Sequence, residues 1–224
     1  MKIPTQISKL IEALEPKIAG IFEGVESAHD MSHLRRTLKY ALQLQEKEGG
    51  DIEVIAVAAF IHDVHRVMQH SEKRFFSPKE SIPKIRELIA DLPLTDKQSE
   101  HICYAIEHHE EYAFGKGGVT VTDIESKIIQ DADNLDMLGA IGIFRAISFS
   151  NSLGIPLYDS SVPFYRSEYC EGQIKDVSVS TVHRMYNKHL RIGANLNTKT
   201  ARELAKPRTK LLQDFIDMVV EEFI

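Results

Sequence analysis

Cysteine is scarce in this chain of 224 residues, and tryptophan is absent. The two cysteines, Cys103 and Cys170, are too few for a disulfide framework or for a four-cysteine zinc site. Long apolar runs are also missing, because the longest, Val54 to Ile61, is far too short to span a bilayer. The first residues, MKIPTQISKLIEALEPK, contain no apolar core of a signal peptide. We therefore expect a cytoplasmic protein that does not enter a membrane.

An excess of basic charge is lacking too. Lys and Arg total 27 and Asp and Glu total 33, which gives a net charge of −6 and a pI near 5.9. This balance argues against nucleic acid as the main partner. Apolar residues make up 43% and charged residues 27% of the chain, as in soluble globular domains. The composition leaves a homodimer open.

Strand-like alternation bounded by turn residues is missing as well, and apolar residues recur at helical spacing instead. The segment 51–69 is apolar nearly all round, so we expect it to be central and buried. The predicted fold is all-α, in one domain that covers residues 1–224. The expected helices span residues 5–23, 30–48, 51–69, 77–90, 95–112, 122–149, 178–192 and 198–222.

Turn and capping residues set the expected ends of these helices. Ser77-Pro78-Lys79-Glu80 and Thr122-Asp123-Ile124-Glu125 read as capping boxes. Pro207 falls inside the last helix and predicts a kink or a split there. Residues 151–176 contain glycines and prolines and predict an irregular segment that acts as a lid.

Histidine is concentrated in one half of the chain. Eight of the ten histidines lie between His29 and His109, and such a density favours metal or acid–base chemistry. Four segments carry most of the candidate side chains: HDMSHLRR at 29–36, AAFIHDVHR at 58–66, EHHEE at 107–111 and QDADNLD at 130–136.

Two of these segments place polar groups beside apolar ones. His62-Asp63 ends a predicted buried helix, where a polar pair is costly unless it is paired or binds a metal. The alternative is a surface dipeptide just past the buried part of that helix. Asp131, Asp133 and Asp136 lie in an apolar stretch, and buried carboxylates need cations. Of these three, Asp133 and Asp136 share a helix face.

His29 and His33 are four residues apart, so a helix would place both on one face. One of them could bind a metal while the other orients a substrate. A set of two histidines and two aspartates suits Mn, Fe, Ni, Co or Zn. Two open positions on the ion would remain for water and for a phosphate oxygen.

The order His…His-Asp…Asp resembles the HD-domain superfamily of metal-dependent phosphohydrolases, and most closely a bacterial single-domain subgroup. The resemblance covers residues 25–222 and implies an all-α, single-domain HD-type helical bundle. Its motif core would span about 25–150, and helices at about 178–222 would complete it. The landmarks here are HDMSHLRR, AAFIHD, IEHH, QDADNLDMLGAIGIFR and GIPLYD.

This resemblance implies one divalent transition metal ion, with Mn preferred and Mg, Ni, Co, Fe or Zn as alternatives. Asp133 is preferred to Asp131 as a ligand because it stands in the superfamily's Ala-Asp-x-Leu context. His29-Asp30 is then not the His-Asp pair of the superfamily, and it only precedes the ligand His33. The implied ligands are His33, His62, Asp63 and Asp133.

The chain departs from the superfamily pattern at two positions. Arg66 stands where some members have a catalytic Glu, so the general base stays open and a metal-activated water could suffice. Asn134 replaces a commoner Arg or Lys. His108-His109-Glu110 resembles the His-His-Glu of the cyclic-dinucleotide phosphodiesterases. We expect His108 and His109 to contact the ligands or the leaving group, with a second metal as the alternative.

Two groups of residues are therefore predicted around the ion. The expected catalytic group is Asp63, His109, His108 and His29. The expected phosphate contacts, for which surface ion pairs are the alternative, are Arg36, Arg66, Arg145, Lys188 and Arg208.

The leading functional hypothesis is a phosphohydrolase that acts on a small phosphorylated metabolite, most plausibly a nucleotide. Phosphoryl transfer needs charge neutralisation, which a metal and several cations supply. A di-iron oxidase or oxygenase is the second hypothesis, with His108 and His109 as additional ligands. A non-catalytic sensor of a metal or nucleotide is the third.

Overall fold

The computed structural model describes residues 3–25, 28–111, 119–164 and 179–223. No β-strand occurs within these ranges, which confirms the all-α prediction. The elements are α1 (Thr5–Ile21), α2 (Met31–Glu48), α3 (Ile52–Ile61), α4 (Val64–Glu72), a 3₁₀ turn η1 (Pro78–Ser81), α5 (Ile82–Ile89), α6 (Asp96–Glu107), α7 (Ile124–Asp136), α8 (Gly139–Ser152), α9 (Thr181–Arg184), a π-helical turn η2 (Met185–His189), α10 (Leu190–Ala194) and α11 (Lys199–Glu222).

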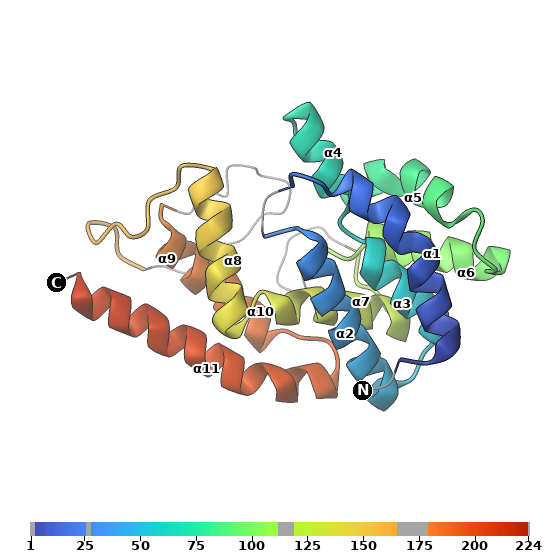
Figure 1. The fold of residues 1–224 in the computed structure, drawn as a ribbon. Coiled ribbons are helices and arrows are strands. Elements are labelled where there is room, and N and C mark those ends of the chain that lie inside the picture. Colours follow the sequence, from blue (N-terminus) through green and yellow to red (C-terminus); the bar gives the residue numbers. More distant parts are fainter. Residues whose placement is uncertain (1–2, 26–27, 112–118, 165–178, 224) are drawn as a thin grey trace.

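Helix α3 forms the centre of the core, as its apolar sequence predicts. Every residue from Val54 to Ile61 is buried. Helices α1, α2, α6 and α7 pack against it, and Figure 1 shows α3 among them. This packing is what brings the start of α2 and the end of α7 close to the end of α3.

Helix α11 is long and runs beside α8 and α10, as Figure 1 shows. Its residues Leu212 and Ile216 belong to the same hydrophobic cluster as α3. Asp131 of α7 fixes the start of α11, because its carboxylate accepts bonds from the Thr198 backbone N–H and hydroxyl, both at 2.7 Å. The C-terminal helices are thus built onto the core that carries the candidate site.

Two predicted helices are each broken in the structure, so those predictions are wrong. The segment 51–69 divides because Asp63 leaves the helical conformation, with φ −88° and ψ 16°. No glycine or proline marks this break in the sequence. The segment 122–149 divides at Gly139, whose φ of +70° favours glycine. Both breaks lie next to candidate site residues.

The remaining expectations for the ends of helices are met in part. The capping box at Ser77 has both of its bonds, whereas the second box is shifted by one residue, because Asp123, not Thr122, caps α7. Pro207 does not split α11. Its ring lies on the exposed side, where water can satisfy the freed carbonyl. Most of the predicted lid, residues 165–176, lies outside the described residues.

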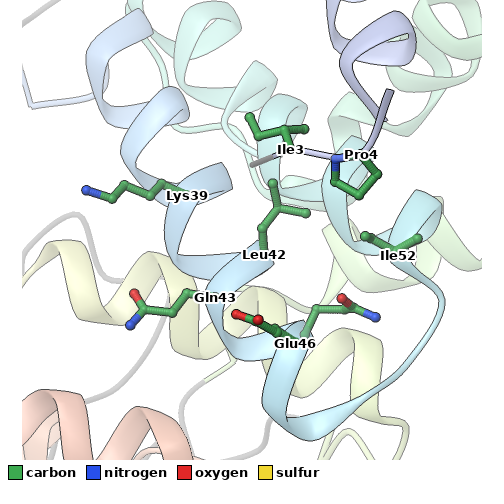
Figure 2. A pocket seen from close by; sticks show the side chains of 8 residues that line it. Ile3, Pro4, Lys39, Leu42, Gln43, Glu46 and Ile52 are labelled. Atoms are coloured by element: carbon green, nitrogen blue, oxygen red, sulfur yellow. The ribbon is translucent and has the colours of Figure 1, made fainter. Parts of the chain in front are cut away.

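A pocket of about 590 Å³ opens between the start of α1 and the second half of α2, as Figure 2 shows. None of the predicted site residues lines it. Its lining is Ile3, Pro4, Lys39, Leu42, Gln43, Gln45, Glu46 and Ile52. Within the described ranges, no helix has the length and apolar character that crossing a bilayer would require.

Candidate metal centre

The four predicted metal ligands meet at one point. His33 lies in the first turn of α2, His62 and Asp63 form the corner between α3 and α4, and Asp133 lies on α7. His33 Nε2 is 3.2 Å from His62 Nε2, 3.3 Å from Asp63 Oδ2 and 3.4 Å from Asp133 Oδ1. His62 Nε2 is 3.7 Å from each of the same two carboxylate oxygens.

The separations from His33 Nε2, 3.2–3.4 Å, fit a shared divalent ion. Ligand atoms about 2.1 Å from one ion lie roughly 3.0–3.4 Å apart when they are adjacent in octahedral or tetrahedral geometry. Asp63 Oδ2 is buried and has no hydrogen-bond partner among the described residues. A buried carboxylate oxygen without a partner is costly unless a cation meets it. Imidazole and carboxylate together suit a borderline transition metal.

The two imidazole rings are held in the orientation that metal binding needs. His62 Nδ1–H donates to the carbonyl of Ala59 at 3.0 Å. His33 Nδ1–H donates to Asp136 Oδ2 at 2.8 Å. Each bond leaves the Nε2 lone pair directed at the shared point. Metal-binding histidines are typically fixed in this way through their other ring nitrogen.

Asp136 is the most important residue that the sequence analysis did not assign. It is fully buried, and Arg36 donates to both of its oxygens, at 2.8 and 2.9 Å. Arg145 Nη1 lies 3.1 Å from Oδ2. Burial would raise the pKa of Asp136, but the bonds from His33 and Arg36 lower it to about 2. The spacing Asp133–Asp136, one helix face, was the signal for this role.

The charges of the cluster compensate one another. Burial would lower the pKa of His62, but the Asp63 carboxylate and the bond with Asp133 raise it to about 9. Burial would raise the pKa values of Asp63 and Asp133, but the neighbouring His62 and His33 lower both. A proton on His62 therefore balances the two carboxylates when no ion is bound, and a bound ion would displace it.

Asp131 lies away from this cluster. Its carboxylate accepts bonds from Asn197 and Thr198 at the start of α11, between 2.7 and 3.1 Å. Burial raises its pKa. The geometry thus places Asp133, and not Asp131, beside the two histidines.

The three other predicted catalytic histidines occupy different places. The ring of His29 lies 6.1 Å from that of His33, at the edge of the cluster. The buried ring of His109 lies 5.0 Å from that of His62, and His109 Nε2 is 3.9 Å from Asp63 Oδ1. Burial, together with the charge of His62, lowers the pKa of His109 to about 4. His108 bonds Glu111 at 2.8 Å and joins none of the metal-compatible groups among the described residues.

Two of the predicted phosphate contacts, Arg66 and Arg208, bind other parts of the protein. Arg66 forms an ion pair with Glu110. Arg208 donates to the Leu135 carbonyl at 3.2 Å and lies over the Tyr40 ring. Both arginines therefore have structural partners of their own, as Arg36 does.

Lys188 and Arg145, which were predicted from the sequence, act on the buried His189 together with Arg184, which was not predicted. Lys188 is buried in η2. Desolvation by burial contributes most to the lowered pKa of His189. The positive charges of Arg184, Lys188 and Arg145 lower this pKa further. Arg184 lies over the Phe149 ring, which packs against His29. This group therefore adjoins the metal cluster.

These features define an all-helical protein that gathers histidines and aspartates from separate helices around one buried point. Residues 31–138 match the family model described as HD domain. This matched segment holds all four candidate ligands, as the resemblance of the motifs implied.

Bacterial relatives share the fold over nearly the whole chain. A structure from Lactobacillus plantarum is 26% identical, with a TM-score of 0.79, and the match covers 100% of this chain and 99% of that one. An HD-superfamily hydrolase from Bacillus thuringiensis is 28% identical, with a TM-score of 0.70 and 98% of both chains covered.

The third relative is the uncharacterised protein YpgQ of Bacillus subtilis. Its sequence is 27% identical over 208 residues, which is 93% of this chain and 91% of YpgQ. The crystal structure of YpgQ in complex with ADP superposes with a TM-score of 0.74 at 23% identity, over 97% of both chains. At that identity the superposition establishes a common fold.

Proposed function

We propose that this protein is a metal-dependent phosphohydrolase that acts on a small phosphorylated metabolite, most plausibly a nucleotide. The observation that carries the proposal is the group of four buried ligand atoms, within 3.2–3.7 Å of His33 or His62 Nε2. A divalent ion held by His33, His62, Asp63 and Asp133 would lower the pKa of a water and polarise a phosphate group.

The residues around this cluster suit an anionic substrate. After desolvation by burial, the charges of Arg184, Lys188 and Arg145 lower the pKa of the buried His189, and positive charge beside a metal centre stabilises the charge of phosphoryl transfer. The lowered pKa of His109 keeps this imidazole neutral at physiological pH, and its Nε2 atom lies 3.9 Å from Asp63 Oδ1. Arg66 cannot act as a base, and its ion pair with Glu110 gives it a structural role.

Two relatives support the reaction class and the ligand. The Bacillus thuringiensis structure is described as an HD-superfamily hydrolase, and YpgQ was crystallised with ADP. Because all of these proteins share the fold, a nucleotide is the preferred substrate class for this chain.

A substrate screen tests the proposal. Purified protein is incubated with nucleoside mono-, di- and triphosphates and with p-nitrophenyl phosphate, each with Mn²⁺, Mg²⁺, Co²⁺ or Ni²⁺, and phosphate and pyrophosphate release are measured. We expect metal-dependent hydrolysis that His62→Ala abolishes and that His70→Ala, an exposed control on α4, preserves. No hydrolysis under any condition, or equal hydrolysis by His62→Ala, would contradict the proposal.

A further inference from the structure

Exposed apolar side chains concentrate on two neighbouring helices in the second half of the chain. Ten large apolar side chains are exposed in the part of the chain that the structure describes, and seven of them lie on α8, on α11 with its C-cap, or in the few residues after α8. The most exposed is Phe144 of α8, at 72%. Helices α8 and α11 pack side by side, as Figure 1 shows. Single apolar residues are common on protein surfaces, but several on adjacent helices indicate a surface that another protein covers.

Helix α11 carries a second apolar stripe besides the one that packs into the core. Leu204, Leu211 and Met218 are seven residues apart, which is close to two helical turns, so they share one face. Leu211 and Met218 are 46% and 59% exposed. The side of α11 that packs into the core carries Leu212 and Ile216 instead. Packing within the chain thus leaves the second stripe open at Leu211 and Met218.

The second stripe lies on the side of α11 that meets α8. Arg208 packs against the first residue of α8, since a Cβ built on Gly139 would lie 3.2 Å from Arg208 Cβ. Leu211 follows Arg208 by three residues and therefore lies next to it on the helix surface. On α8, Ile141 and Phe144 are likewise three residues apart, and both are exposed. The exposed apolar side chains of the two helices thus border one another.

Charge on α11 is divided between its two halves. Residues 199–210 carry five basic side chains and one acidic side chain, whereas residues 211–222 carry four acidic side chains and no basic one. The helix macrodipole favours the reverse order, with acidic side chains in the first turn and basic side chains in the last, and α11 has neither. The division is therefore unfavourable for the helix by itself, and an oppositely charged neighbour would offset it.

A second copy of α11 in the antiparallel direction fits both the stripe and the charges. With a two-fold axis at Leu211, Leu204 lies opposite Met218 of the partner subunit, and each basic half faces an acidic half. A parallel pair would instead set like charges against each other. We propose that this protein forms a homodimer through antiparallel α11 helices that cross at Leu211, with Ile141 and Phe144 of α8 at the edge of the interface. None of the four candidate metal ligands lies on α8 or α11, so this inference does not depend on the function proposed above.

The mass of the full chain in solution tests the dimer. It is measured by light scattering after size-exclusion chromatography and by sedimentation velocity, over a range of protein concentrations. We expect twice the chain mass of 25.4 kDa for the wild type. Leu211→Lys sets two like charges at the axis and should reduce the mass to that of one chain. Val119→Lys, which changes an apolar residue that is 50% exposed outside α8 and α11, is the matched control and should stay dimeric.

Charge reversal tests the antiparallel direction. Four side chains would meet on either side of the axis: Lys206 and Lys210 of one chain, and Asp214 and Asp217 of the partner subunit. Changing both aspartates to Lys makes all of these positions basic, and changing both lysines to Asp makes all of them acidic. Each doubly substituted protein should be monomeric alone. An equimolar mixture of the two should form a heterodimer, and this rescue shows that both variants are folded.

Three outcomes would overturn the proposal. A wild type that keeps the mass of one chain at every concentration would show that no second copy covers this face. A dimer that survives Leu211→Lys would place the interface elsewhere. Reversed variants that stay monomeric when they are mixed, beside a dimeric wild type, would contradict the antiparallel arrangement.

Discussion

Three carboxylates within six residues of α7 have three different environments. Asp131 receives neutral donors from the start of α11, and Asp133 faces the two histidines. Asp136 is bonded to His33 and to Arg36. Their positions on the helix direct them to different neighbours, so three identical side chains have three different roles in the fold.

The first prediction concerns Asp136. Asp136→Asn removes the negative charge behind His33, so His33 Nε2 becomes a weaker ligand. We expect Mn²⁺ affinity to fall about 10–100-fold, as for other groups behind a metal ligand. Equilibrium dialysis measures this change, with Asp131→Asn as the matched control. An unchanged affinity in Asp136→Asn, or an equal loss in Asp131→Asn, would show that Asp136 does not support the site.

The pH dependence of stability gives a second prediction. The pKa of Asp136 is lowered from 3.8 to about 2, so its ionised form stabilises the fold by about 2 kcal/mol. Because the folded pKa is depressed, this contribution is present above about pH 4 and is lost as the pH falls towards 2. The free energy of unfolding is measured by urea denaturation with EDTA present, at pH 6 and at pH 2.5. The difference in this free energy between wild type and Asp136→Asn should be smaller at pH 2.5. A gap that is the same at both values would contradict this account.

At the scale of the elements, the corners between helices were harder to predict from the sequence than the helices themselves. The amphipathic stripes of α1 and α2 predict their positions to within about two residues, because burial of one face decides both. The break after Ile61 was not predictable, because apolar residues flank it and no glycine or proline marks it. Its cause is the geometry of the site, where His62 and Asp63 must both approach His33.

The corner between α7 and α8 yields a third prediction. A Cβ added at Gly142 would lie 2.2 Å from the Met137 carbonyl oxygen, so the two helices could not keep their present approach. Gly142→Ala should lower the free energy of unfolding by roughly 1–3 kcal/mol. Gly20→Ala on α1, where nothing lies within 4 Å, should instead be neutral or stabilise by about 0.5–1 kcal/mol. Chemical denaturation measures both, and equal stabilities for the two variants would contradict the packing described.

At the scale of the molecule, the metal centre ties distant parts of the chain together. His33 and Asp136 are 103 residues apart, and Arg145 bonds the Ala28 carbonyl across 117 residues. Local patterns predicted the side chains of the cluster but not these partners. Contacts between helices decide which arginine neutralises a carboxylate and which faces a substrate, and local spacing carries no information about them. This is why Arg36, Arg66 and Arg208 were predicted as phosphate contacts but have protein partners.

A fourth prediction follows from ligands that come from three separate segments. An ion that binds only the folded chain adds about 2.7 kcal/mol at 100 times its Kd, which raises the Tm by roughly 5–10 °C for a chain of this size. Differential scanning calorimetry should show that EDTA lowers the Tm of the Mn²⁺-loaded wild type by this amount. The Tm of His62→Ala should not respond to EDTA. Equal responses of the two proteins would place the stabilising ion elsewhere.

The central claim is that His33, His62, Asp63 and Asp133 hold a divalent ion. Anomalous diffraction at the manganese absorption edge, from crystals grown with MnCl₂, tests it most directly. The account predicts a strong peak within about 2.3 Å of His33 Nε2 and His62 Nε2 and of one oxygen from each aspartate. A map with no peak there, or with its strongest peak beside His101 and Asp123, would contradict it.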